Sequence, residues 1–291
     1  VTLEPCSHFG VTPPCVDTII KKKIKKVFFS IKDPDLRSYN KSHAILKKSG
    51  IQTKFGFLNS NIKKFYRSYF KYKKNSLPFV TCKLAISKDF FTINKNKENI
   101  ITNESSRSRV HLMRSKHDCI ITSSGTILKD NPRLTCRIKG LENRSPSRIL
   151  LDRKLKISMK SKIFKDAKKY QTIVFYNSIN KKKIKKLKKM NVKLFRLPVN
   201  ERNLLNLKEC LKIAKKLGFN RIFIEAGLEL TYSFLKNKLV DDFKLCISKK
   251  KLGNKGRASF KKYYNVFLKK KNFYNEKVNL FNDKLLSFNL K

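Results

Sequence analysis

The sequence predicts an α/β protein built on a largely parallel sheet. Apolar runs of strand length alternate with longer, Lys-rich stretches in which apolar residues recur at spacings of three and four. Strands that alternate with helices in this way are typical of parallel sheets covered by their connecting helices. The predicted strands are residues 27–31, 79–86, 119–122, 149–152, 172–176, 192–197, 221–225 and 243–247, and the predicted helices are residues 17–23, 43–48, 62–72, 105–114, 181–190, 204–217 and 230–238.

Residues 204–217 show the helical pattern most clearly. Apolar side chains recur along this stretch, and Gly218 follows at the position where a glycine commonly ends a helix. The end of the chain is different, because it holds only short alternating runs, at 264–268 and 278–281. These runs predict antiparallel strands that close one edge of the sheet.

The length of 291 residues predicts two domains. The boundary is expected at residues 71–78, a polar and Lys-rich stretch that ends in a proline directly before the apolar run 79–86. We therefore expect one domain over residues 1–75 and a second domain over residues 78–291.

The chain starts at Val1 rather than at a methionine, and residues 1–3 have the composition of the end of a buried strand. We therefore expect a fragment whose front part is missing. No apolar run approaches the roughly 18 residues that a membrane helix needs, and no signal peptide is visible. Seven cysteines form no repeated disulfide pattern, so we expect reduced thiols and a cytoplasmic protein without a membrane partner.

The formal net charge is +50, from 70 basic and 20 acidic residues. A nucleic-acid partner is one interpretation of this charge. However, only 14 of the basic residues are Arg, the residue that nucleic-acid sites favour, and the Lys runs are scattered along the chain. We therefore expect a solvated basic surface and no nucleic-acid partner.

Two cysteines near the start form a candidate metal site. Cys6 and Cys15 are nine positions apart, in a segment where Pro and Gly set the turns and a predicted helix follows. Thiolates near a helix N-terminus have depressed pKa values, and the thiolate is the form that binds zinc. Two ordinary buried cysteines beside a Pro-rich loop are the alternative interpretation.

A family resemblance emerges when residues 3–15 are taken together. They read Leu-Glu-Pro-Cys-Ser-His-Phe-Gly-Val-Thr-Pro-Pro-Cys, which resembles the zinc-site segment of the bifunctional deaminase-reductase family of riboflavin biosynthesis. The resemblance implies that Cys6 and Cys15 are zinc ligands and that residues 1–75 are the rear part of a cytidine-deaminase-like domain. Nucleic-acid deaminases place their two cysteines only three positions apart, so the wider gap favours the riboflavin branch.

The rest of such a zinc site is absent from the sequence. Zinc deaminases need a His-x-Glu pair, in which the His is the third ligand and the Glu shuttles protons. No Glu stands two positions after any of the four histidines, which are His8, His43, His111 and His117. We expect the catalytic Glu upstream of Val1, and we do not expect this polypeptide to deaminate a substrate by itself.

The resemblance continues through the reductase domain of the same family, which is similar to dihydrofolate reductase in fold. In residues 110–137 a predicted helix leads into a strand, a Ser-Ser-Gly-Thr turn and an Asp-Asn-Pro-Arg loop. The resemblance implies that Thr126 and Asp130 contact NADPH. Arginine suits a phosphate because its planar fork binds two oxygens at once. The implied ribose-phosphate pocket of the substrate is lined by Arg114, Leu134 and Arg137.

A second block covers residues 221–235, where a buried strand ends in Glu225-Ala-Gly227 and a helix begins. A glycine at this junction leaves backbone N–H groups available for a phosphate, assisted by the helix dipole. The resemblance implies that Glu225 is a substrate ligand. It also implies that Gly227 and the residues up to Ser233 cover the cofactor.

Several positions depart from the family pattern, and four of them concern the expected site. Phe90 stands where the family has a glycine, and Arg153 stands where it has a serine. Glu98 and Ile100 fall in the segment where the family has a substrate-facing Ser and a cofactor-stacking Trp. These changes concern cofactor and substrate affinity rather than the fold.

The resemblance implies two steps of riboflavin biosynthesis. One is deamination of diaminohydroxyphosphoribosylaminopyrimidine with Zn²⁺. The other is NADPH-dependent reduction of 5-amino-6-(5-phosphoribosylamino)uracil to the ribityl product, with hydride carried to C1 of the ribosyl group. We expect a homo-oligomer whose partner is this small-molecule substrate. The alternatives are a degenerate or reductase-only paralogue, and a basic nucleic-acid-binding protein on a reused deaminase fold.

Overall fold

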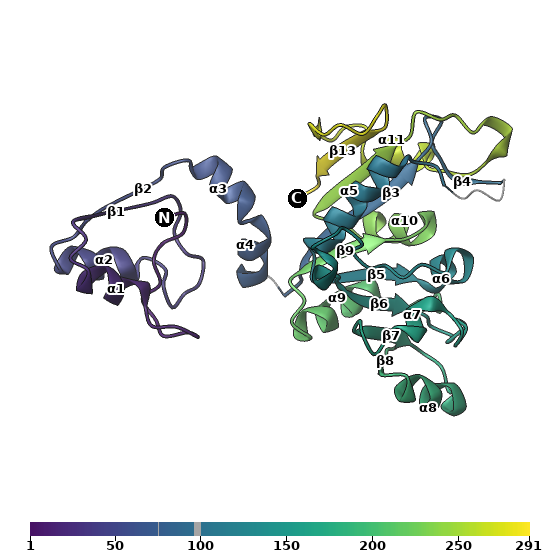
Figure 1. Cartoon of the computed structure of the whole chain (residues 1–291), viewed down its shortest axis with the longest axis horizontal. Coiled ribbons are helices and arrows are strands. Elements are labelled where there is room, and N and C mark those ends of the chain that lie inside the picture. The colour runs from purple at the N-terminus through teal and green to yellow at the C-terminus, as the bar shows by residue number, and fades with distance from the viewer. Residues whose placement is uncertain (75, 96–99) are drawn as a thin grey trace. The chain divides into compact units, whose positions relative to one another are not determined.

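The computed structural model describes residues 1–74, 76–95 and 100–291. The chain folds as two compact units, Val1–Leu77 and Pro78–Lys291 (Figure 1). Among the helices described, none combines the length and the apolar character that a membrane crossing requires.

The unit Val1–Leu77 is built on two parallel strands, β1 (Lys26–Phe29) and β2 (Gln52–Phe55). Two helices, α1 (Cys15–Lys21) and α2 (Lys41–Lys48), pack against each other. Apolar side chains from both layers bury a small core. Its buried members are Val16, Val27, Leu46 and Ile51.

The helix predicted before the linker is divided into α3 (Asn59–Phe65) and α4 (Arg67–Lys74). The N–H of Tyr66 donates to the carbonyl of Ile62, and the carbonyl of Tyr66 accepts the N–H of Phe70, both at 2.9 Å. Tyr66 thus ends one helix and precedes the next. The spacing of apolar residues could not show this division, because it continues across the break.

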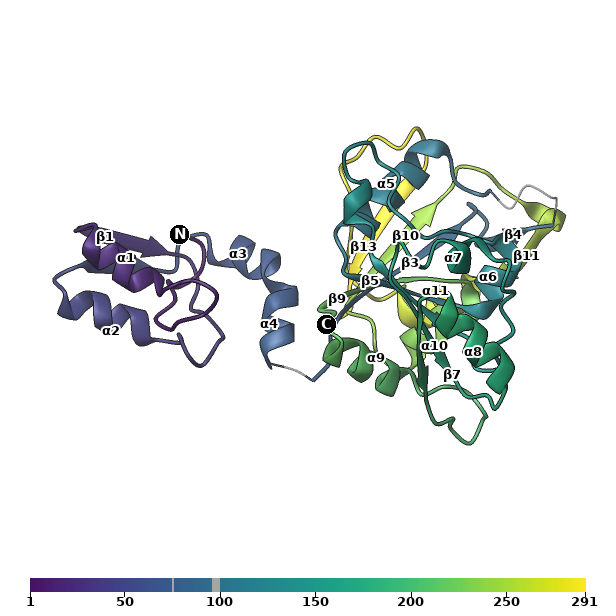
Figure 2. The ribbon, with the colours of Figure 1, turned by 60° about the horizontal axis from the view of Figure 1, so that its bottom comes forward.

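Within the described part of Pro78–Lys291, nine strands form one sheet (Figure 2). They are β3 (Phe79–Ile86), β5 (Cys119–Ser123), β6 (Ser147–Leu151), β7 (Thr172–Tyr176), β8 (Val192–Arg196), β9 (Arg221–Glu225), β10 (Asp242–Ile247), β12 (Phe273–Asn275) and β13 (Lys284–Asn289). Their order is β12-β13-β10-β3-β9-β5-β6-β7-β8. The strands from β10 to β8 are parallel, whereas β13 and β12 are antiparallel. A separate antiparallel pair joins β4 (Phe91–Asn94) to β11 (Gly256–Ser259).

This mixed sheet confirms the predicted α/β class. The strands β3, β7 and β9 have the predicted bounds, because each is a nearly continuous apolar run. Strands of this kind lie between two layers of helices, so their sequences contain little else than apolar residues. The strand β7 is buried along its whole length.

The two strands predicted near the end of the chain are wrong in position. Residues 264–268 lie mostly in a helix, α11 (Lys261–Phe267), and the second predicted strand is irregular. Tyr263 and Phe267 are one helical turn apart, and their rings lie 4.7 and 6.0 Å from the ring of Tyr232. The alternating apolar residues therefore belong to a helix, and two of its aromatic rings contact Tyr232. The antiparallel edge itself exists, formed by β12 and β13.

Helices cover both faces of the large sheet. The hydroxyl of Thr81 in β3 shares a hydrogen bond with His117, just beyond α5, whereas Cys82 contacts Thr231 of α10. Neighbouring residues of a strand point to opposite faces, so α5 and α10 lie on opposite sides of β3. Besides α11, the α-helices described in this unit are α5 (Glu104–Ser115), α6 (Ser124–Asp130), α7 (Lys162–Lys165), α8 (Lys181–Lys189), α9 (Leu207–Lys216) and α10 (Leu228–Lys236).

The helix α9 begins later than its apolar spacing predicts. The side chain of Asn206 accepts the N–H groups of Lys208 and Glu209, at 3.0 and 3.3 Å, and so caps the first turn. Leu204 lies outside the helix in a loop. The helix ends as predicted, with Gly218 at a φ of +93° that favours glycine.

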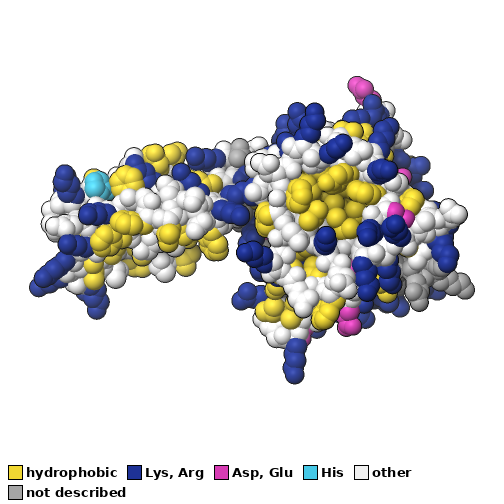
Figure 3. All heavy atoms as spheres, turned by 90° about the horizontal axis from the view of Figure 1, so that it is seen from above, with side chains coloured by type: hydrophobic (Ala, Val, Ile, Leu, Met, Phe, Trp, Pro, Cys, Tyr) yellow, Lys and Arg dark blue, Asp and Glu magenta, His cyan; other side chains and the backbone are white. Residues whose placement is uncertain are grey.

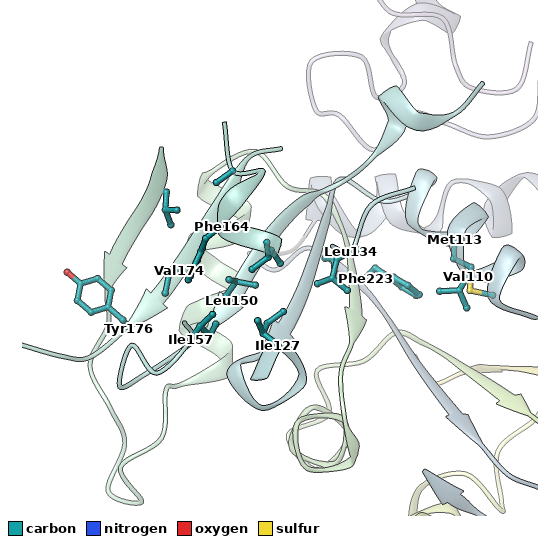
Figure 4. Close-up of a cluster of buried hydrophobic side chains, with 14 of the residues drawn as sticks. Val110, Met113, Ile127, Leu134, Leu150, Ile157, Phe164, Val174, Tyr176 and Phe223 are labelled. Carbon is teal, nitrogen blue, oxygen red and sulfur yellow. The ribbon is translucent and has the colours of Figure 1, made fainter. Parts of the chain in front are cut away.

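The main apolar core lies between the sheet and its helices (Figure 4). Val174 and Leu150 come from neighbouring strands, and Phe164 covers them from α7. Ile127 of α6 and Val110 of α5 extend the same cluster toward the site described below.

Arg148 of β6 is a fully buried cation whose guanidinium organises the segments around it. Its Nη1 donates to Asp166 Oδ1 at 2.6 Å, and the side chain of Asp166 is one-fifth exposed. Burial alone lowers the pKa of this guanidinium, and the Asp166 carboxylate opposes that effect. Its other acceptors are the Thr172 hydroxyl and the carbonyls of Arg133, Ile163 and Tyr170.

Replacing Arg148 by alanine is expected to destabilise this unit by about 3–5 kcal/mol, because the substitution leaves buried acceptors without a donor. Urea unfolding followed by circular dichroism measures the change. Arg144→Ala is the matched control, since Arg144 is exposed and its removal is expected to change the stability by about 0.5 kcal/mol or less. Equal unfolding midpoints for the two variants would contradict the structural role of Arg148.

Candidate active site at the carboxyl ends of the strands

The centre of the candidate site is an ion pair between Arg114 of α5 and Glu225 at the end of β9. Arg114 Nε donates to Glu225 Oε2 at 2.9 Å and Nη2 donates to Oε1 at 2.7 Å, which is a bidentate pair. Burial pushes the pKa of Glu225 upward, but the Arg114 charge and its hydrogen bonds outweigh burial and lower that pKa to about 2. Two residues predicted as separate substrate ligands are thus partners of each other.

A row of polar side chains crosses the sheet beside this pair. Glu225 of β9 lies opposite Lys83 of β3, Lys83 lies opposite Lys244 of β10, and Lys244 lies opposite Ser287 of β13. Glu276 accepts hydrogen bonds from Lys244 at 2.7 Å and from Ser287 at 2.8 Å. Lys83 makes no ion pair within the described residues, so its ammonium group is available beside Glu225.

Lys83 was not predicted from the sequence. The available signal was a lysine inside the otherwise apolar run of β3, because lysine is rarely found in a buried strand unless its charge is paired or has a function. In the structure its side chain is half-buried, on the face that also carries Glu225.

Arg137 adds a second guanidinium on the same side of the sheet. Burial and the positive charges of Arg114 and Arg133 lower the pKa of Arg137, so these three cations lie close enough to repel one another. The backbone N–H of Arg137 donates to Nδ1 of His111 at 3.2 Å. Cations held together in this way attract a multiply charged anion such as a phosphate.

His111 is a neutral neighbour of these cations. Burial and the charges of Arg114 and Arg137 lower the pKa of His111 to about 4. Its ring lies 3.0 Å from the carbonyl oxygen of Thr135, which also accepts a hydrogen bond from Arg114 Nη1 at 2.9 Å. The neutral imidazole therefore adds no further charge to the site.

Leu134 has a different environment from the other predicted substrate residues. Its side chain is buried in the main apolar core, as Figure 4 shows, at 2% exposure. Its φ of +59° places the backbone in the left-handed region. The predicted substrate contact of Leu134 stays a prediction, and the buried side chain leaves only its backbone to make that contact.

The predicted Ser-Ser-Gly-Thr turn is the first turn of α6. The Ser123 hydroxyl oxygen accepts the N–H of Thr126 at 3.3 Å and caps the helix. Thr126 is half-buried at this end, and Asp130 is exposed at the other end of the helix. The two predicted NADPH contacts are therefore more than one helical turn apart, and their roles stay predictions.

Gly227 lies at the N-terminus of α10, directly after β9. No side chain caps this end of the helix. The first N–H groups of a helix have no partner within it, so they favour an anion. This geometry agrees with the phosphate contact expected near Gly227.

A cavity of about 990 Å³ lies at the carboxyl ends of β5 and β6 and beside α10. Two of its lining residues, Asp152 and Glu229, are acidic. Six are basic, so the net charge of the lining is positive. These six are Arg153, Lys154, Lys156, Arg202, Lys208 and Lys236.

The departures from the family pattern fall in different places. Phe90 keeps a φ of +71°, a conformation that favours glycine, and its ring packs 5.3 Å from the ring of Tyr264. Arg153 lines the cavity. Ile100 is 53% exposed, and Glu98 lies outside the described residues.

In the unit Val1–Leu77 the structure brings the two predicted zinc ligands together. The N–H of Cys15 donates to Cys6 Sγ at 3.2 Å, and both thiols are accessible. Within the described residues, however, no third Cys, His, Asp or Glu joins them in a group that could hold a metal ion. Catalytic zinc sites use three protein ligands, so the residues present do not make up such a site.

Residues 78–277 match the family model described as the RibD C-terminal domain. This range covers most of the unit that holds the Arg114–Glu225 pair and the cavity. The chain belongs to the RibD family.

Relatives within the RibD family align beyond this domain. The riboflavin biosynthesis protein RibD of Bacillus amyloliquefaciens is 32% identical over 83% of the chain, and that of Buchnera aphidicola is 32% identical over 89%. The chain spans 64% of the length of the first protein and 72% of the second.

Solved RibD structures have the same fold. Acinetobacter baumannii RibD (form 1) aligns with the whole chain at a TM-score of 0.83 and 26% identity, over 80% of its own length. The diaminohydroxyphosphoribosylaminopyrimidine deaminase/5-amino-6-(5-phosphoribosylamino)uracil reductase of Thermotoga maritima aligns with the whole chain at 0.81 and 28% identity, over 78% of its own length.

The half-buried His117 makes the stability of this unit depend on acid pH. Burial lowers its pKa to about 4, and the neutral ring stacks on Phe223. Below pH 6.5 the unfolded chain binds a proton that the folded chain excludes, so stability is present above pH 6.5 and is lost as the pH falls toward 4. The predicted loss between pH 7.5 and 4.5 is about 2–3 kcal/mol.

The measurement is urea unfolding of the wild type and of His117→Gln at both pH values. The variant loses the titrating group, so its stability is expected to fall less between the two pH values. His111→Gln is a second test of the same linkage, because the pKa of His111 is also lowered to about 4 and its removal is expected to reduce the pH dependence as well. An identical pH dependence in the wild type and His117→Gln would contradict the assignment.

Proposed function

We propose that the unit Pro78–Lys291 is an NADPH-dependent reductase of riboflavin biosynthesis. The match of residues 78–277 to the RibD C-terminal domain carries this proposal. The substrate is 5-amino-6-(5-phosphoribosylamino)uracil, the compound after which the reductase of T. maritima is named. The product is the corresponding ribityl compound.

The residues present fit a phosphorylated dinucleotide. The cavity has the volume of a ligand site, its lining is basic, and the uncapped N-terminus of α10 lies next to it. When bound, NADPH supplies the hydride that the proposed reaction adds to C1 of the ribosyl group. The expected cofactor contacts of Thr126, Asp130 and Gly227 belong to this proposal.

The charged residues on the other side of the sheet bind the substrate. Arg137 and Arg133 hold its phosphate, because their two positive charges lie close enough to act on each other and together attract a multiply charged anion. Arg114 keeps Glu225 ionised, so this carboxylate accepts hydrogen bonds from sugar hydroxyl groups and does not donate a proton. Lys83 lies beside Glu225 and is available to donate a hydrogen bond.

Arg137→Ala tests the phosphate contact. The substitution is expected to raise the KM for the substrate at least tenfold with little change in kcat, because it removes binding that is equal in the ground and transition states. Steady-state NADPH oxidation by the purified chain gives both constants. Lys139→Ala is the control, since this exposed lysine lies in the same loop. A raised KM in Lys139→Ala together with an unchanged KM in Arg137→Ala would contradict the contact between Arg137 and the phosphate.

The proposed function itself is tested by complementation. The chain is expressed in a bacterium that lacks the reductase and requires riboflavin, and growth without riboflavin is expected. A soluble chain that does not restore growth supports the degenerate paralogue instead. The nucleic-acid alternative has no support from the structure, since Lys and Arg are scattered over the face shown in Figure 3 rather than gathered in a stripe.

For the unit Val1–Leu77 we propose the rear part of a cytidine-deaminase-like domain. The pairing of Cys6 with Cys15 supports this, because two adjacent thiols are suited to bind zinc together. The described residues do not supply the remaining ligand or the proton-shuttling Glu, so no deamination step is assigned to this chain. A homo-oligomer remains a prediction, to be tested by light scattering of the purified chain.

A further inference from the structure

The residues that follow β6 form one wall of the basic cavity. β6 ends at Leu151, and Arg153, Lys154 and Lys156 follow it in the lining. In dinucleotide sites, an acidic residue in a comparable place binds the ribose hydroxyl groups of NADH, whereas a nearby arginine binds the 2′-phosphate of NADPH. The charge of this wall therefore bears on which of the two cofactors binds.

The acidic residue of this wall is already engaged. Asp152 is 2% exposed, and its Oδ1 accepts the N–H of Lys156 at 2.8 Å while Oδ2 accepts the N–H of Ile157 at 2.9 Å. Both oxygens shape the turn after β6. The carboxylate is therefore poorly placed to accept hydrogen bonds from a ribose, and the next residue along the wall is Arg153.

Arg153 is held in place by a compact loop. Its Nη1 donates to Asn203 Oδ1 at 2.6 Å, and within the described residues it has no acidic partner. The loop is fixed at its base, because the N–H of Asn200 donates to the carbonyl of Leu204 and the N–H of Leu204 donates to Asn200 Oδ1. Arg202, next to Asn203, lines the same cavity and is exposed.

Two guanidinium groups therefore reach one cavity from two segments, one after β6 and one from the loop before α9. The amide oxygen of Asn203 orients the guanidinium of Arg153 without neutralising its charge. A planar guanidinium binds two phosphate oxygens at once. Both guanidinium groups line the cavity that would receive such a phosphate.

We propose that Arg153, with Arg202, binds the 2′-phosphate of the dinucleotide and makes this chain selective for NADPH over NADH. This inference rests on the proposed reductase function and assigns the residues that bind the 2′-phosphate of its cofactor. Glu229, the other acidic residue of the lining, lies on α10 and is left unchanged in the test.

Equilibrium binding by the full chain tests the proposal, with NADP⁺ and NAD⁺ as probes. The wild type is expected to bind NADP⁺ at least tenfold more tightly than NAD⁺. Arg153→Ser is expected to weaken NADP⁺ binding at least tenfold and to leave NAD⁺ binding within about twofold, because only NADP⁺ carries the phosphate. Arg202→Ser is expected to change the ratio in the same direction.

Two control variants separate charge recognition from support of the loop. Arg196→Ser removes an exposed arginine of β8 that does not line the cavity, and both affinities are expected to stay unchanged. Asn203→Ala removes the hydrogen bond to Arg153 but keeps the guanidinium, so NADP⁺ is expected to remain preferred. Binding of neither dinucleotide by the folded wild type overturns the proposed function. Binding of both, with the same preference in Arg153→Ser, overturns only the assignment of Arg153.

Discussion

The ion pair between Arg114 and Glu225 fixes the geometry on which the candidate site depends. It joins the last turn of α5 to the end of β9, and the same guanidinium also donates to the carbonyl of Thr135. The loop that follows α6 is therefore attached to α5 and the end of β9 through Arg114, in addition to the contact between Arg148 of β6 and the carbonyl of Arg133. Because His111 contacts both Thr135 and Arg137, the position of Arg137 depends on that attachment.

The helix α5 is fixed to the sheet by carboxylates along its length. Asp283 accepts the Asn103 N–H and the Ser106 hydroxyl at its start, at 2.9 and 2.8 Å. Glu276 accepts Arg109 at 2.8 Å near the middle. Burial pushes the pKa of Glu276 upward, but Lys244 and Arg109 lower it to about 2, so the contact is ionic at neutral pH. Such a helix cannot shift without breaking several charged contacts.

Much of the fold could be predicted from the sequence because its parallel strands are buried on both faces. A strand such as β7 must be apolar throughout, and this pattern is hard to mistake for a surface helix. The edge of the sheet was harder, since β12 is exposed along its length and its residues carry no burial signal. The start of α6 was also missed, because serines and a glycine are typical of turns as well as of helix caps.

The site could be predicted as a set of residues but not as a set of contacts. Arg114 and Glu225 were singled out separately, 111 positions apart, and nothing in the sequence indicates that they bind each other. Leu134 lies in the expected segment, yet its left-handed backbone sends its side chain into the core. Lys83 was not predicted, because the apolar run of β3 indicates a buried strand and does not show that its one charged side chain lies beside Glu225.

The distribution of acidic residues explains how the fold tolerates a net charge of +50. Several of the few carboxylates accept backbone N–H groups at turns, where lysine cannot replace them, since an ammonium group accepts no hydrogen bond. Glu4 accepts the N–H groups of Asp33 and Asn40, and Asp118 accepts those of Asn220 and Arg221. Exposed positions have no such requirement. An excess of lysine can therefore accumulate on the surface without loss of the fold, provided that the carboxylates at these turns are kept.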